Sequence, residues 1–73
     1  MRAFTYHVVY RLIGEYFKGV DVVASSKAEA YDKAVYETIL KNEGELPYSA
    51  WVASVTYNNG NHKQFNTHEG KPY

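Results

Sequence analysis

The chain of 73 residues contains no cysteine, which excludes disulfide bonds and metal sites built from thiolates. Its apolar runs are only a few residues long, far below the roughly 20 residues of a membrane-spanning helix. The N-terminus lacks the apolar core of a signal peptide. We therefore expect a soluble, cytoplasmic, single-domain protein. Domains of this size often need extra stabilisation, so association as a homodimer or with another protein is also expected.

The chain has no excess of charge of either sign. Eight lysines and arginines balance eight aspartates and glutamates, and the cations are scattered along the sequence. Proteins that bind nucleic acid through its phosphates concentrate positive charge on one face. The five glycines form neither a Gly-x-Gly-x-x-Gly motif nor a phosphate-binding loop. Composition thus offers no signature of a nucleotide-binding site, and no cofactor is expected.

Aromatic residues are abundant, and many of them alternate with polar residues. The chain has eight tyrosines, three phenylalanines and one tryptophan. Strict alternation places every second residue on the same face of a strand. Two such runs are present, with apolar positions Phe4, Tyr6, Val8, Tyr10 and Leu12 in the first and Trp51, Ala53, Val55 and Tyr57 in the second. They predict strands over 3–12 and 49–57.

The first run is followed by a hairpin turn that ends in Gly14. A three-residue loop over 12–14 pairs Tyr10 with Tyr16 and starts a second strand over 15–24. A two-residue turn would instead place Asp21 on the apolar face, so the buried pattern favours the longer loop. Gly19 is expected to mark a bulge in this second strand.

A second hairpin is predicted around Gly60 by the same reasoning. A three-residue loop over 58–60 pairs Val55 with Lys63 and Ala53 with Phe65, on the same face as Trp51. A two-residue turn would leave Phe65 opposite a polar residue. The domain is expected to span 1–67, with a mobile tail over 68–73 because that segment has no periodicity.

One helix is predicted between the hairpins, from about Lys27 to Asn42. The segment Ser26-Lys27-Ala28-Glu29 is a capping box, in which Ser26 Oγ accepts from the Glu29 amide and the Glu29 carboxylate accepts from the Ser26 amide. Gly44 and Pro47 end the helix. Its inward stripe is expected to consist of Ala28, Tyr31, Ala34, Val35, Thr38 and Ile39.

These elements predict an α+β fold of type β-β-α-β-β, with a four-stranded antiparallel sheet and the helix on one face. A right-handed crossover from the second to the third strand favours the order 2-1-3-4. The predicted core consists of Phe4, Tyr6, Val8, Val20, Val22, Tyr31, Val35, Ile39, Trp51, Val55 and Phe65.

Neither a metal site nor an active site is predicted. His7 and His62 would lie two strands apart, roughly 9 to 10 Å, whereas zinc ligands must each lie about 2 Å from the metal. His62 and His68 are too far apart along the chain. Ser26 is explained as a cap, Ser25, Ser49 and Ser54 lack a nucleophile elbow, and a chain this small has little room for a deep pocket. We expect a protein without enzymatic activity.

The face of the sheet away from the helix, here called the open face, is expected to carry hydrogen-bonding groups. Its predicted residues are Thr5, His7, Val9, Arg11, Val52, Ser54 and Thr56. RNA-recognition modules stack bases on aromatic residues at the centre of such a face, and this predicted face has none there. Single-stranded nucleic-acid binding therefore remains the alternative to the preferred hypothesis, a protein-binding module.

Six residues on the open face and its rim are the candidate contact residues for a protein partner: His7, Arg11, Phe17, Thr56, His62 and Gln64. Arg11 offers a rigid fork for carboxylates, and Phe17 offers an exposed apolar anchor. The others supply adaptable hydrogen bonds. Free strand edges could also accept a strand from a partner.

The segment from Tyr6 to Ala34 carries a strand, Gly14, the strand Val20-Asp21-Val22-Val23-Ala24, then Ser25-Ser26 and Glu29-Ala30. It resembles the strand-strand-helix start of many small phage and mobile-element accessory proteins, and some anti-CRISPR proteins have a similar build. The resemblance covers about half of the chain and assigns no functional residue. It implies an accessory or inhibitory protein that acts on a host or defence factor.

Overall fold

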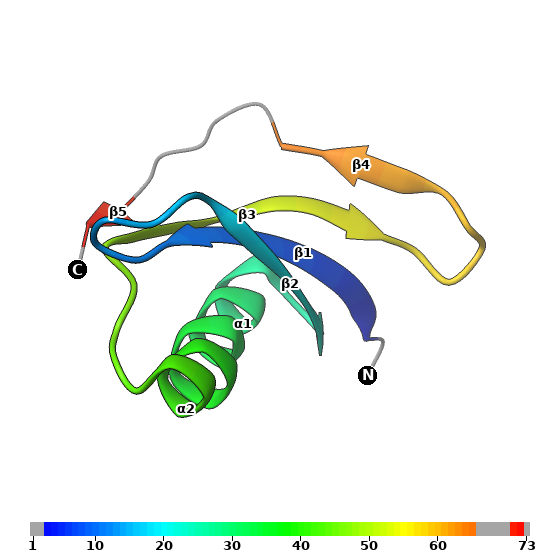
Figure 1. Cartoon of the computed structure of the whole chain (residues 1–73). Helices are drawn as coiled ribbons and strands as arrows, with labels where there is room; N and C mark the ends of the chain where they lie inside the picture. The colour runs from blue at the N-terminus through cyan, green and yellow to red at the C-terminus, as the bar shows by residue number, and fades with distance from the viewer. Residues whose placement is uncertain (1–2, 66–70, 73) are drawn as a thin grey trace.

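The computed structural model describes residues 3–65 and 71–72. The elements in chain order are β1 (Phe4–Arg11), β2 (Lys18–Ala24), α1 (Lys27–Asp32), η1 (Lys33–Ile39), α2 (Leu40–Glu43), β3 (Ser49–Thr56), β4 (His62–Gln64) and β5 (Lys71–Pro72). The helical segments α1, η1 and α2 follow one another directly, and η1 has π-helical hydrogen bonding. Together they form one helix that lies against one face of the sheet (Figure 1).

The sheet has the predicted topology. Its four main strands are antiparallel neighbours in the order β2-β1-β3-β4, which confirms the α+β fold class and places β1 and β3 at the centre. The short strand β5 pairs with the start of β3, where Ala50 lies opposite Lys71. Of the tail expected over 68–73, the structure describes only Lys71 and Pro72, so its expected mobility stays a prediction.

The β3–β4 hairpin has the predicted register. Val55 lies opposite Lys63, and the Phe65 amide donates to the Ala53 carbonyl at 2.9 Å. Gly60 supplies the positive φ of 91° at the end of the turn. Phe65 packs against the core on the helix side, as expected.

The β1–β2 hairpin is longer than predicted. Tyr10 lies opposite Lys18 rather than Tyr16, and the turn is closed by the Glu15 amide donating to the Leu12 carbonyl at 3.1 Å. Because the register differs from the prediction by an even number of residues, the faces remain in phase. The longer connection lets Lys18 reach Glu15 in the turn and Glu43 at the end of the helix, while Phe17 packs on the opposite face.

The bulge predicted at Gly19 is wrong, because the β1–β2 pairing continues regularly through that residue. The His7 ring occupies the space beside Gly19 instead. A Cβ at this position would lie 2.5 Å from His7 Cε1, so glycine is needed for close approach rather than for a bulge.

The bulge lies in β3. His7 pairs with Ser54, whereas the next residue, Val8, pairs with Val52, so Ala53 is the extra residue. It reverses the alternation of the strand: Val52 becomes buried, and Trp51 lies opposite Val9 on the open face. The predictions that Trp51 belongs to the core and Val52 to the open face are therefore wrong.

The core lies between the sheet and the helix in two neighbouring clusters. One consists of Tyr6, Val8, Ala24, Ala30, Ala34, Val52 and Val55, and the other of Tyr10, Leu12, Val35, Ile39 and Ala50. Apart from Trp51, the predicted core residues are buried or packed against these clusters. The predicted position of Ala28 is wrong: Ala28 is exposed and Ala30 is buried, because residues two apart point to nearly opposite sides of a helix.

The predicted cap is half confirmed. Ser26 is the N-cap, and its Oγ accepts from the Glu29 amide at 3.1 Å. The Glu29 carboxylate does not bind the Ser26 amide but accepts from the Ser25 amide at 2.7 Å and from Ser25 Oγ at 3.2 Å. The backbone is extended at Ser26, which brings the amide before it within reach. Gly44, with φ of 78°, ends the helix as predicted.

Candidate functional site

The open face carries a group of four packed side chains at the end of the sheet where the β1–β2 hairpin turns. We call Arg11, Phe17, Tyr48 and Trp51 the aromatic cluster. The Phe17 and Trp51 rings meet edge to face with centroids 5.4 Å apart. Phe17 is 56% exposed and Tyr48 is 46% exposed. The cluster thus presents large aromatic surfaces to solvent from positions fixed by β1, β3 and the hairpin.

The Arg11 guanidinium lies over two of these rings. Its Cζ lies 5.7 Å from the Phe17 centroid and 5.1 Å from the Tyr48 centroid, distances at which an aromatic face attracts a cation. The Tyr48 amide donates to the Arg11 carbonyl at 2.7 Å, which fixes the two residues side by side. The ion pairs among the described residues are His7–Asp21, Lys18–Glu15 and Lys18–Glu43, and none of them involves Arg11.

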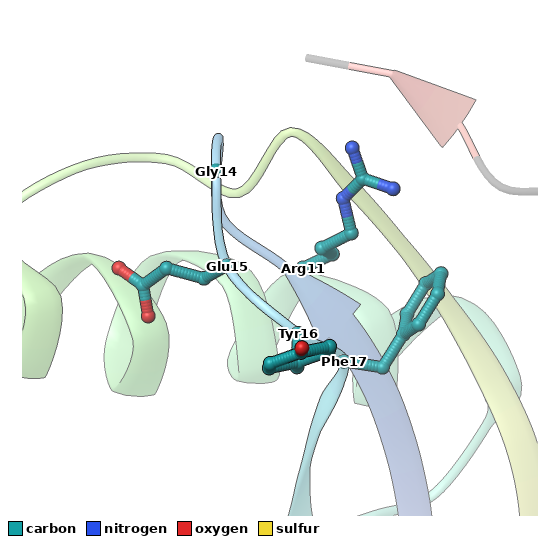
Figure 2. A pocket seen from close by; sticks show the side chains of 5 residues that line it. All are labelled: Arg11, Gly14, Glu15, Tyr16 and Phe17. Carbon is teal, nitrogen blue, oxygen red and sulfur yellow. The ribbon is translucent and has the colours of Figure 1, made fainter.

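A shallow hollow of about 400 Å³ lies beside the cluster (Figure 2), lined by Arg11, Gly14, Glu15, Tyr16 and Phe17. Tyr16 is 93% exposed. The Glu15 carboxylate points away from the Arg11 guanidinium in Figure 2 and is paired with Lys18 at 3.0 Å. The hollow is therefore open and partly apolar, and Arg11 is the positively charged residue in its lining.

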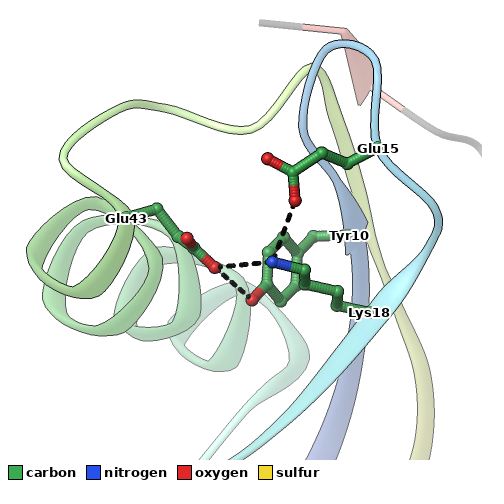
Figure 3. Close-up of polar contacts among 4 residues, drawn as sticks. All are labelled: Tyr10, Glu15, Lys18 and Glu43. Atoms are coloured by element: carbon green, nitrogen blue, oxygen red, sulfur yellow. Dashed lines mark hydrogen bonds and ion pairs between the residues drawn. The ribbon is translucent and has the colours of Figure 1, made fainter.

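A polar network ties the base of this hairpin to the end of the helix (Figure 3). Tyr10 Oη donates to Glu43 Oε2 at 3.1 Å, and Lys18 Nζ donates to the same oxygen at 3.2 Å. Burial, followed by the hydrogen bond to Glu43, raises the pKa of Tyr10. Hydrogen bonds to Glu15 and then Glu43 raise the pKa of Lys18. Because Lys18 follows Phe17 directly, this network helps to fix Phe17 on the open face.

The centre of the open face carries a second contact between β1 and β2. His7 Nδ1 lies 2.7 Å from Asp21 Oδ1 across the two strands, and the ring covers Gly19. Both side chains are substantially exposed. This pair presents polar groups on the open face without forming a buried site.

The structure brings together two of the six predicted contact residues, Arg11 and Phe17, in one cluster. Thr56 and His62 are cross-strand partners near the turn of the β3–β4 hairpin. Gln64 lies opposite Ser54, which in turn lies opposite His7. Strand alternation places five of the six residues on the open face, and its contacts with Arg11 and Trp51 place Phe17 there. Thr56, His62 and Gln64 lie toward the opposite end of the sheet from Arg11.

Sequence reasoning missed Tyr48 and Trp51 as site residues. Alternation predicts Trp51 in the core, and the bulge at Ala53 that places it on the open face has no glycine or proline to signal it. The sequence signal for Tyr48 is its place directly after Pro47, at the start of the predicted third strand. In the structure Pro47 is fully buried, and Tyr48 stands at the rim of the sheet as a candidate contact residue.

The lysines whose surroundings are described lie mainly on the helix side of the molecule. Lys27 and Lys63 lie over the Phe65 ring, Lys33 donates to the Val23 carbonyl at 2.9 Å, and Lys18 binds Glu43 at the helix end. Arg11 is therefore the sole lysine or arginine on the open face among the described side chains.

Within residues 3–65 and 71–72, no three histidine, aspartate or glutamate side chains come together in a way that could hold a metal ion. No helix in the same part of the chain is long and apolar enough to cross a membrane. Comparisons with protein-family models, with curated proteins and with solved structures found no match to this chain.

Proposed function

We propose that this chain is a non-enzymatic protein-binding module whose contact surface is the open face, centred on the aromatic cluster. The observation that carries the proposal is the exposure of Phe17 and Tyr48 around a stacked arginine. Aromatic residues and arginine dominate the energetically important centres of protein interfaces. Because these side chains are held by strands and by one another, little conformational entropy is lost on binding.

Single-stranded nucleic-acid binding is a second candidate, favoured by one observation. Trp51 on the open face provides a ring on which a base could stack, which the sequence alone did not predict. However, tracking a phosphate backbone requires several cations along one path, and Arg11 is the sole lysine or arginine on this face among the described side chains. The charge distribution therefore favours a protein partner.

We further propose that the module serves a phage or mobile element as an accessory or inhibitory protein that acts on a host or defence factor. The support for this setting is the resemblance of residues 6–34 to the strand-strand-helix start of such proteins. Occupying a surface of its target is the mode of action that an exposed aromatic cluster suits.

The proposal is tested by capture of the partner with matched variants. The protein is immobilised, and proteins and nucleic acids retained from the source lysate are both identified. The cluster variant combines Arg11→Glu with Phe17→Ala. The control variant combines Lys41→Glu with Leu40→Ala, which makes the same two kinds of change on the exposed side of α2. Circular dichroism establishes that both variants are folded.

We expect the wild type and the control to retain the same protein, and the cluster variant to retain at most about a tenth as much. Equal retention by all three would remove the aromatic cluster as the contact surface. Retention of oligonucleotides that falls steeply with salt would instead support the nucleic-acid candidate.

A further inference from the structure

Among the described residues no carboxylate pairs with Arg11, and its surroundings prepare it to bind one. Its guanidinium is stacked by Phe17 and Tyr48, its Nε is buried without a hydrogen-bond partner in the described residues, and none of the ion pairs in residues 3–65 includes it. Stacking holds the planar fork in one orientation and leaves its terminal nitrogens to form paired hydrogen bonds with a carboxylate.

We propose that the aromatic cluster binds an acidic peptide segment of its partner, in which an aspartate or glutamate and a large apolar residue stand two positions apart. This inference rests on the proposed function and specifies the partner's chemistry. The carboxylate binds Arg11, and the apolar side chain packs on Phe17 and Trp51. The immediate surroundings are compatible with an acid, because Glu15 is paired with Lys18 and Asp21 lies next to His7.

The spacing follows from the geometry of the cluster. The Arg11 Cζ lies 5.7 Å from the Phe17 centroid, and the Phe17 and Trp51 centroids are 5.4 Å apart. In an extended peptide, residues two apart point to the same side and are separated by roughly 7 Å. A segment of the form acid-x-apolar therefore reaches from the guanidinium to the exposed ring surface.

A defined peptide tests this directly. The probe is an extended Gly/Ser-rich peptide of about nine residues, roughly 30 Å long, with glutamate and phenylalanine two positions apart. Matched peptides replace the glutamate with glutamine or the phenylalanine with alanine. Binding is followed by the fluorescence of Trp51, the single tryptophan of the chain, and by amide chemical shifts. Wild type is compared with Arg11→Gln and Arg11→Lys.

We expect the glutamate peptide to bind wild type about fivefold more tightly than the glutamine peptide. Arg11→Gln should abolish this preference, and Arg11→Lys should remove most of it because a lysine keeps the charge but loses the stacked fork. Loss of the phenylalanine should weaken binding to all three proteins. Equal binding of the glutamate and glutamine peptides, a preference that survives Arg11→Gln, or no binding of any peptide would overturn the inference.

The inference and the proposed function fail in different ways. If partner capture from lysate depends on Phe17 and Trp51 but is unchanged by Arg11→Gln, the protein-binding surface stands and the acidic peptide is wrong. Displacement of the bound glutamate peptide by a short single-stranded oligonucleotide, with matching shifts at Trp51, would support nucleic acid as the occupant and contradict both.

Discussion

At the scale of single residues, the contact between Gly19 and His7 shows how one missing side chain shapes the open face. The His7 ring packs so closely on Gly19 that a Cβ there would lie 2.5 Å from His7 Cε1. In this position His7 Nδ1 lies 2.7 Å from Asp21 Oδ1. Glycine ordinarily weakens a strand relative to alanine by about 0.5–1 kcal/mol. Its presence in the edge strand β2 is thus explained by the ring that it accommodates.

Gly19→Ala should therefore have opposite consequences in two backgrounds. In wild type it displaces His7 from Asp21 and lowers the free energy of unfolding, whereas in a His7→Ala background it should be neutral or stabilising. We expect the two effects to differ by about 1 kcal/mol, as measured by urea denaturation. Equal effects in both backgrounds would show that the position of the His7 ring does not require glycine at residue 19.

Residue-level prediction from sequence succeeded where alternation was unbroken and failed where the backbone interrupted it. Tyr6, Val8 and Val55 are buried as predicted. Trp51 and Val52 exchanged faces because Ala53 is a bulge, and alanine in a strand gives no sign of one. Hydrophobicity alone favours placing a tryptophan in the core, so the aromatic cluster was not predictable as a unit.

At the scale of elements, the helix depends on its start. Ser26→Ala removes the hydroxyl that accepts from the Glu29 amide and should lower the free energy of unfolding by about 0.5–2 kcal/mol. Ser25→Ala is the matched control, because the Ser25 amide still donates to Glu29 and the loss should be smaller. Chemical denaturation of the three proteins compares them, and coincident midpoints for wild type and Ser26→Ala would contradict the role of the cap.

The link between the β1–β2 hairpin and the helix end should make stability fall in alkaline solution. The pKa of Tyr10 is raised above its ordinary value of 10.0, and that of Lys18 above 10.5. A group with a raised pKa in the folded state stabilises the fold below its unfolded pKa, and this contribution is lost as the pH rises through the folded pKa. Stability should therefore decline above about pH 10.

Tyr10→Phe should make that decline shallower, because the phenol that must ionise is gone. The free energy of unfolding is measured at about pH 8 and about pH 11 for wild type, Tyr10→Phe and Tyr16→Phe. The last variant removes a phenol that is 93% exposed and should behave as wild type. An identical alkaline decline in Tyr10→Phe would show that the contact with Glu43 does not couple the hairpin to the helix.

The accuracy with which strand ends and strand pairing could be predicted depended on the loops between the strands. Gly60 ends its turn as predicted, and the second hairpin has the predicted register. The first loop does not end at Gly14: that residue has a positive φ of 77°, but strand pairing resumes only at Lys18. The first hairpin is longer because Lys18 pairs with Tyr10 and reaches Glu43 from a distant part of the chain. Contacts of this kind join distant parts of the chain, so the residues of the turn do not predict them.

At the scale of the whole molecule, the two sides differ in chemistry. The helix side holds most of the described lysines, several of them engaged with Phe65 or with carboxylates. The open face combines exposed aromatic rings with Arg11, two of whose neighbours, Tyr16 and Phe17, are drawn in Figure 2. This division leaves the helix to complete the core and makes the open face available to a partner.

The most direct test of that division is an amide chemical-shift map of the isotopically labelled protein titrated with the partner that it captures. The account predicts that the largest shifts fall on Arg11, Phe17 and the neighbouring Tyr48 and Trp51, and that the exposed helix residues Leu40 and Lys41 are unaffected. Shifts centred on the helix, with the aromatic cluster unchanged, would contradict it.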